Sequence, residues 1–387
     1  MGETTPVTLA DIDAAWLTGA LAQAGSISGD ATIDALEQER LGEGEGFMGE
    51  IARLRLTYGS GTGPASVVAK VPTSDPGNRA TGRSLGIYER EVRAYDTLLA
   101  SVDVPVPRSH VAIYEARGDE ADFLADMIKA ERLPLWLLRR LVRREQTDAD
   151  VPPCILVLDD LDDLSMGDQV AGCDPDRAAA ALTVAARMHA STWGDRCPEE
   201  RHWFVNGDVV PRLFHAIYLD NRKSFERQVT SVFRPAVFEL ARSVRKTGLA
   251  RIRELHERAP RCLLHADFRL DNLFFDRNGD VASVIDWQSV NRGPAVLDVA
   301  YFLTGSIDPA TPESVVDDLL AHYHAGLVDA GVGDYDLARL RADYDEALLL
   351  LLHRMSGLDS LELGDDRGQQ LIETWLRRVD ARMVRIV

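Results

Sequence analysis

A short stretch near residue 280 constrains the fold more than any other part of the sequence. Two apolar runs, at 273–275 and 281–285, flank an Asn278-Gly279 pair. An Asn-Gly pair readily adopts the positive backbone dihedral angles of a tight turn, so this pattern predicts a β-hairpin. Polar residues lie just before the first run and just after the second. The hairpin is therefore expected to bring them together at its open end.

The polar residues at this open end have the chemistry of a phosphoryl-transfer site. Asp267 and Asn272 are five residues apart on the loop before the hairpin, and Asp286 follows its second strand. Phosphoryl transfer to an alcohol needs a carboxylate that orients the hydroxyl and takes its proton, together with oxygen ligands for Mg²⁺. A lone His-x-Asp is common and usually structural, but the combined pattern with Asn272, the hairpin and Asp286 indicates a base and two metal ligands.

Strand patterns concentrate in the first part of the chain, and helical patterns in the second. Strands are expected at 51–58, 66–71, 111–114 and 154–158. Helices are expected from Thr8 onwards, over 86–100, and through most of the chain after 164. This distribution predicts an α+β fold of two unequal lobes, the first carrying an antiparallel sheet.

The lobe boundary is expected where the buried strand 154–158 runs into an acidic crossing. We place the N-terminal, nucleotide-binding lobe at 1–158 and the larger helical C-terminal lobe at 159–387. A charged, helix-like segment at about 118–150 is expected as an insertion in the first lobe. Its apolar and basic part, 133–144, suits either a lid over the substrate or a membrane surface, and the acidity of the chain favours the lid.

Composition narrows the partners. The net charge is −19, and so acidic a chain repels nucleic-acid phosphates, so we expect a small-molecule substrate and no nucleic acid. The four cysteines are scattered and form no zinc-type pair, which is typical of a reducing compartment. No signal-like start and no apolar run of about 18 residues is present, so we expect a cytoplasmic protein without a membrane span. The oligomeric state is not predicted by the sequence.

The His-Ala-Asp-Phe-Arg-Leu-Asp-Asn loop at 265–272, with Ile-Asp-Trp at 285–287, resembles the aminoglycoside phosphotransferase and choline kinase superfamily. Three further motifs resemble its ecdysteroid-kinase-like branch: Gly-Glu-Gly-Phe at 44–47, Leu-Asp-Asp-Leu at 158–161 and Gly-Asp-Gln at 167–169. The resemblance covers about 41–303. It implies a two-lobed protein-kinase-like fold, ATP or GTP as phosphate donor with Mg²⁺, and a hydroxyl group of a small molecule as acceptor.

The resemblance also implies roles for single residues. Asp267 would be the catalytic base, Arg269 would touch the γ-phosphate, and Asn272 and Asp286 would hold Mg²⁺. Lys70 would bind the α- and β-phosphates, with Glu91 as its partner rather than Glu89. The remaining nucleotide contacts would come from backbone groups at 156–160, including Leu158 and Asp160, and from the glycine-rich loop with Gly44 and Gly46. Glu43 and Glu45 would repel phosphate, so that loop could act only through its amides.

Several nearby residues have simpler structural interpretations. His265 is expected to hold the loop through backbone hydrogen bonds, Trp287 to pack in the core and Asp298 to brace the catalytic loop. His189, on an apolar helix, is expected as a packing residue.

The acceptor and two rival functions stay open. The branch resemblance favours a bulky, partly apolar alcohol, with aminoglycosides or other antibiotics, choline-like amines and sugars as alternatives. A nucleotide-binding regulator without turnover is a second hypothesis, although Asp267, Asn272 and Asp286 are all present. A serine hydrolase is disfavoured because no Gly-x-Ser-x-Gly stretch occurs.

Overall fold

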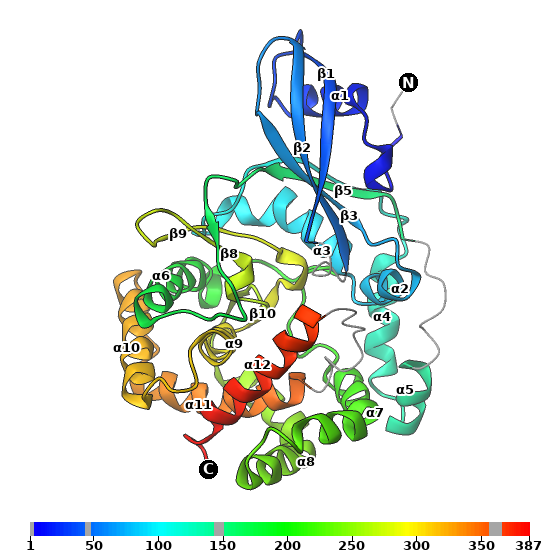
Figure 1. Ribbon diagram of the computed structural model, residues 1–387. Coiled ribbons are helices and arrows are strands. Elements are labelled where there is room, and N and C mark those ends of the chain that lie inside the picture. Colours follow the sequence, from blue (N-terminus) through cyan, green and yellow to red (C-terminus); the bar gives the residue numbers. More distant parts are fainter. Residues whose placement is uncertain (1–3, 43–47, 143–150, 356–365) are drawn as a thin grey trace.

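The computed structural model describes residues 4–42, 48–142, 151–355 and 366–387. Figure 1 shows a small lobe built on a β-sheet above a larger lobe built mainly of helices. The α+β fold of two unequal lobes expected from the sequence is confirmed. Among the described helices, none is long and apolar enough to cross a membrane.

The sheet of the small lobe has five antiparallel strands in the order β1-β2-β3-β5-β4. Their bounds are Thr32–Leu41, Gly49–Ser60, Ser66–Pro72, Cys154–Asp159 and Ser109–Tyr114 in that spatial order. The sequence did not predict β1. Its side chains are nearly all exposed because it lies at the sheet edge, so it lacks the alternation of apolar and polar residues that identifies a half-buried strand.

The N-terminal helix begins later than expected. Thr8 caps only a short 3₁₀ turn at Leu9–Asp11, and α1 runs over Ala14–Gln23. Asp13 caps the start of α1, because its carboxylate accepts the amide of Trp16 at 2.7 Å. The apolar side of α1 packs against the sheet in a core that includes Leu17, Leu54 and Val67.

A group of short helices connects the sheet to the large lobe. They are α2 at Pro76–Ser84, α3 at Ile87–Arg93, a π-helical turn at Ala94–Leu98 and a 3₁₀ turn at Leu99–Ser101. The single helix expected over 86–100 is therefore α3 and its irregular continuation. Arg90 of α3 donates to the carbonyls of Trp203 and Gln288, both at 3.1 Å. These bonds fix α3 to the large lobe.

The segment expected as an insertion forms α4 at Glu120–Ala130 and α5 at Leu135–Val142. It packs on α7, Pro211–Val229, of the large lobe (Figure 1). Arg139 pairs with Asp220, and Glu131 accepts the backbone amides of Arg212 and Leu213. Residues 143–150 of the expected insertion lie outside the described residues.

The large lobe holds the remaining helices and two small sheets. The helices are α6 Pro175–Ser191, α7, α8 Pro235–Arg258, α9 Val296–Ser306, α10 Glu313–Asp329, α11 Leu337–Met355 and α12 Asp366–Met383. One sheet has the order β6 Ser165–Met166, β8 Leu273–Phe275 and β9 Val281–Val284, and the other pairs β7 Arg261–Leu264 with β10 Asn291–Pro294.

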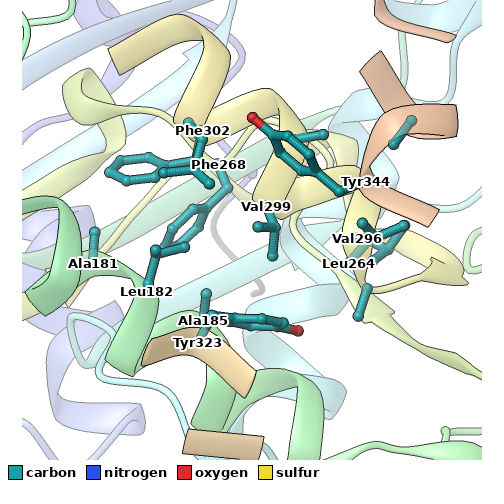
Figure 2. Packing of buried hydrophobic residues seen from close by; sticks show 14 of the residues in the cluster. Ala181, Leu182, Ala185, Leu264, Phe268, Val296, Val299, Phe302, Tyr323 and Tyr344 are labelled. Atoms are coloured by element: carbon teal, nitrogen blue, oxygen red, sulfur yellow. The ribbon is translucent and has the colours of Figure 1, made fainter. Parts of the chain in front are cut away.

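The core of this lobe reaches the loop predicted to carry the chemistry. Figure 2 shows Leu182 of α6 and Val299 and Phe302 of α9 gathered around Phe268, which lies on that loop. The Phe268 and Phe302 rings are 5.5 Å apart, and both side chains are fully buried. Burial of Phe268 therefore anchors the polar residues on either side of it in the sequence.

Candidate active site

The predicted hairpin is present, with β8 at Leu273–Phe275 and β9 at Val281–Val284. A 3₁₀ turn at Leu270–Asn272 leads into β8. The amide of Ile285 donates to the carbonyl of Asn272 at 3.0 Å. This bond closes the open end of the hairpin and places Asp286 beside Asn272, as the sequence predicted.

The loop before the hairpin is held from below by Asp298. Its carboxylate accepts the backbone amides of His265 at 2.7 Å and Ala266 at 2.8 Å. Ala266 has a φ of 62°, in the left-handed region that is costly for a residue with a Cβ, so the loop needs this support. His189 contacts Asp298 at 3.3 Å and the hydroxyl of Tyr323 at 2.8 Å. The expected bracing role of Asp298 and packing role of His189 are confirmed.

His265 and Trp287 are also structural, as expected. The Nε2 atom of His265 lies 2.9 Å from the carbonyl of Ile285, and its ring is 4.7 Å from that of Trp287. Both side chains are fully buried, and the Trp287 indole donates to the carbonyl of Val284. They hold the loop against the second strand of the hairpin.

Asp267 lies between several donors and is still reachable from solvent. Its side chain is 17% exposed. One carboxylate oxygen accepts from the Tyr301 hydroxyl at 2.7 Å, and the other from Asn272 Nδ2 at 3.2 Å and Arg269 Nε at 3.3 Å. Burial raises the pKa of Asp267, but Arg269, Arg354 and the Tyr301 hydroxyl outweigh it and hold that pKa below its usual value. The carboxylate is therefore ionised and fixed in orientation.

Asn272 and Asp286 present oxygen atoms of the kind that Mg²⁺ prefers. The Asn272 Nδ2 donates to the backbone carbonyl and the carboxylate of Asp267, which leaves its Oδ1 as the possible metal ligand. Among the described residues, no group of three or more His, Cys, Asp or Glu side chains forms a metal cage. Two protein oxygens completed by phosphate and water are typical of Mg²⁺ in nucleotide sites, so the residues fit that ion.

Lys70 joins the two lobes at this point. Its Nζ lies 2.8 Å from Glu91 Oε1 and 2.7 Å from Asp286 Oδ1. Burial lowers the pKa of Lys70, but the carboxylates of Asp286 and Glu91 raise it more, so the ammonium keeps its charge. The predicted pairing with Glu91 is present. Glu89 contacts His202 at 3.0 Å instead, because a residue two positions away points elsewhere on a helix.

The other residues predicted to contact the nucleotide are Leu158, Asp160, Gly44 and Gly46. Leu158 lies in β5, paired with both β3 and β4. The carboxylate of Asp160 is held by Arg53 Nε at 2.7 Å and by the Ser66 hydroxyl at 2.6 Å, so it is committed to a structural clamp on the sheet. Gly44 and Gly46 lie outside the described residues. A nucleotide role for Asp160 would have to use its backbone.

Arg269 is held on the acidic side of the loop. It donates to Asp271 as well as to Asp267, and Asp271 in turn accepts the amide of Gln169 at 2.7 Å. The side chain of Gln169 accepts the amide of Leu270 at 2.8 Å. The Gly-Asp-Gln motif therefore braces the turn that carries Asn272.

A comparison with protein families matches residues 43–331 to the description "Ecdysteroid kinase-like family". The match spans most of the chain. The chain belongs to the ecdysteroid kinase-like family. Its class as a phosphotransferase acting on hydroxyl groups, expected from the sequence, is thereby confirmed.

Solved structures with similar folds are distant in sequence. A macrolide 2′-phosphotransferase from Brachybacterium faecium is 14% identical, covers 94% of this chain and 97% of its own, and has a TM-score of 0.45. A choline kinase from Streptococcus pneumoniae is 14% identical, with 94% and 96% covered and a TM-score of 0.45. An amicoumacin kinase in complex with AMP-PNP and Ca²⁺ is 13% identical, with 89% and 88% covered and a TM-score of 0.47. No curated protein matches this ecdysteroid kinase-like chain.

Two residues of the site were not predicted from the sequence. Tyr301 lies on α9 within an apolar pattern that reads as core, and Arg354 lies near the end of α11, far along the chain from Asp267. The guanidinium of Arg354 stacks 4.3 Å above the Tyr301 ring, and one of its nitrogens is 3.7 Å from Asp267 Oδ1. Only the packing of α9 and α11 brings them to the loop.

Replacing Gly167 by alanine is expected to damage the site through its support. An added Cβ would lie 2.5 Å from the Leu270 carbonyl oxygen, so the turn that carries Asn272 must move. We expect Gly167→Ala to lower the free energy of unfolding by about 1–3 kcal/mol in urea denaturation. Gly333→Ala is the control, because a Cβ there meets nothing within 4 Å. Equal stability of the two variants would contradict the bracing role.

Removing the Tyr301 hydroxyl is expected to change the pH dependence of the reaction. The hydroxyl is among the groups that lower the pKa of Asp267, so Tyr301→Phe raises that pKa towards its usual value of 3.8. In the wild type the acid limb of kcat/KM due to Asp267 lies below about pH 4. The variant should move this limb to higher pH and lose about tenfold or less in rate at pH 7, since Asn272 and Arg269 still orient the carboxylate.

The matched control is Tyr335→Phe, which removes another tyrosine hydroxyl bonded to a buried carboxylate, that of Asp343. Its pH–rate profile should match the wild type. An unchanged acid limb in Tyr301→Phe would show that the hydroxyl does not act on Asp267.

Proposed function

We propose that this ecdysteroid kinase-like protein is a small-molecule O-kinase, which transfers the γ-phosphate of ATP or GTP to a substrate hydroxyl. The observation that carries the proposal is the ammonium of Lys70 between Glu91 and Asp286. Asp286 directly follows Ile285, whose amide donates to the carbonyl of Asn272, and the Asn272 side chain donates to Asp267. A cation, oxygen atoms suited to a metal and a fixed carboxylate, the groups that phosphoryl transfer needs, therefore lie close to one another between strand β3 and the β8–β9 hairpin.

Asp267 would orient the acceptor hydroxyl and take its proton. Phosphoryl transfer passes through a loose transition state in which the hydroxyl keeps its proton until late, so positioning matters more than basicity. A carboxylate of lowered pKa that is held by three donors suits this role. Arg269, held beside Asp267 and Asp271, is the group proposed to meet the charge of the γ-phosphate.

Lys70 would bind the α- and β-phosphates, with Glu91 fixing its position. When bound, Mg²⁺ would neutralise charge on the phosphates, and Asn272 Oδ1 and Asp286 would hold it. AMP-PNP and Ca²⁺ in the amicoumacin kinase structure support a nucleotide and a divalent ion. Backbone groups at Leu158 and Asp160 and the loop with Gly44 and Gly46 remain the proposed contacts to the rest of the nucleotide. The division at 158 remains the proposed boundary of the nucleotide-binding lobe.

Measurements of phosphate transfer distinguish the alternative acceptors from one another and an enzyme from a regulator. A bulky, partly apolar alcohol is the acceptor that the family description supports, and an aminoglycoside or another antibiotic is the main alternative. A nucleotide-binding regulator without turnover would bind Mg²⁺ and nucleotide but transfer no phosphate to any alcohol. The ordered Asp267 carboxylate, open to solvent, favours the enzyme.

Substitutions on the two sides of the site should have different effects. Asp267→Asn should lower turnover by about 10³-fold or more and leave the Kd of the nucleotide nearly unchanged, because Asp267 acts on the acceptor. Asp286→Ala should also weaken Mg²⁺-dependent nucleotide binding, by about tenfold or more. Steady-state transfer to an alcohol library and calorimetric nucleotide titration measure the two effects.

Asp280→Asn, in the exposed turn of the same hairpin, is the control and should match the wild type. Wild-type turnover in Asp267→Asn would show that the assignment of the base is wrong. Absence of transfer to every acceptor in the wild type, with intact nucleotide binding, would favour the regulator.

A further inference from the structure

One cation beside the proposed base, Arg354, forms no hydrogen bond to a carboxylate among the described residues. The Arg354 side chain is 45% exposed, and its guanidinium carbon lies over the Tyr301 ring, 4.3 Å from the centroid. The nearest described carboxylate oxygen is Asp267 Oδ1 at 3.7 Å, beyond hydrogen-bonding distance. The neighbouring Arg269 is engaged at shorter range, with Asp267 at 3.3 Å and Asp271 at 2.5 Å. Arg354 therefore presents a charged edge to the space in front of the base.

Asp267 does not need Arg354 to be oriented. Its two oxygens already accept from Tyr301, Asn272 and Arg269 at 2.7–3.3 Å. A further cation at 3.7 Å makes the carboxylate a weaker base. Its position is better explained by a group that arrives with the substrate than by the base itself.

The charge of Arg354 discriminates among acceptors. An amino alcohol whose hydroxyl binds Asp267 would bring its ammonium group close to the guanidinium of Arg354. Repulsion between the two positive charges is unfavourable in a partly buried site. A carboxylate would accept charge-assisted hydrogen bonds from the guanidinium. The planar guanidinium can donate two parallel hydrogen bonds to the two oxygens of a carboxylate. A single guanidinium without a hydrogen bond to a described carboxylate balances one negative charge, which fits a carboxylate better than a phosphate dianion.

We propose that the acceptor is a hydroxy acid, whose carboxylate binds Arg354 while its hydroxyl binds Asp267. This inference rests on the proposed kinase function. The hydroxyl oxygen forms a bond to the γ-phosphorus, the bond from that phosphorus to the β,γ-bridging oxygen breaks, and the hydroxyl proton passes to Asp267. The products are a phosphate monoester that keeps its carboxylate and a nucleoside diphosphate. Arg354 is thus a specificity-determining residue.

The test compares three forms of each acceptor skeleton: the hydroxy acid, its methyl ester and the corresponding amino alcohol. Aliphatic, aromatic, sugar and steroid skeletons are each used in all three forms. Transfer from Mg²⁺-ATP is measured as kcat and KM for the wild type, Arg354→Gln and Arg354→Lys. Arg242→Gln, which removes an exposed arginine of α8, is the matched control.

The wild type should prefer the acid over its ester and amine by about 10- to 100-fold in kcat/KM. Arg354→Gln should lose this preference mainly through a higher KM for the acid, with a much smaller change in KM for the ester, and Arg354→Lys should recover part of the preference. Equal use of the three forms, or a preference that survives in Arg354→Gln, would overturn the inference. An equal fall in kcat for all three forms would also overturn it, because Arg354 would then act on the transferred phosphate.

The outcomes also separate the inference from the function on which it rests. Asp267-dependent transfer to esters or amines that equals or exceeds transfer to the matching acids would overturn the hydroxy acid and keep the kinase. If no form of any skeleton is phosphorylated, ATP hydrolysis is measured instead. Hydrolysis that falls in Asp267→Asn and that no acid stimulates would also overturn only the inference. Loss of that hydrolysis as well would overturn the proposed function.

Discussion

The rest of the site depends on the ion pairs that the ammonium of Lys70 forms with Glu91 and Asp286. Lys70 draws together three parts of the chain: strand β3, helix α3 through Glu91, and the end of the β8–β9 hairpin through Asp286. Removing a charge from water costs several kcal/mol unless partners compensate it, so this buried cation requires both carboxylates. Lys70 and Asp286 are also the groups proposed to bind the phosphates and the divalent ion, so the same side chains join the lobes and would serve the proposed chemistry.

Backbone strain surrounds this centre. Among the described residues, Ala266 and Asp286 are the non-glycine residues with positive φ, at 62° and 64°, and they lie on either side of the catalytic loop and hairpin. Such conformations cost about 1–3 kcal/mol each and persist only where the surroundings fix them. Asp298 fixes the first through two backbone amides, and Lys70 holds the side chain of the second. The strain turns Asp286 towards the small lobe.

The sequence predicted what local patterns encode and missed what packing creates. The hairpin, the buried strand β5 and the relation of Asn272 to Asp286 follow from apolar runs and one Asn-Gly turn, and all are present. The edge strand β1 carries polar residues on both faces and gives no such signal. Arg53 of β2 donates a hydrogen bond to the carboxylate of Asp160, a contact that spacing along the chain cannot show. Tyr301 and Arg354 reach Asp267 only because α9 and α11 pack together.

We expect Asn272, Asp286 and Lys70 to hold one divalent ion and the nucleotide phosphates between the lobes without a large rearrangement. Crystals grown with Mn²⁺ and a non-hydrolysable ATP analogue test it directly, because Mn²⁺ gives an anomalous signal that locates the ion. The account predicts an ion ligated by Asn272 Oδ1 and the carboxylate of Asp286, with Lys70 Nζ against the phosphates. An ion away from both residues, or phosphates away from Lys70, would contradict it.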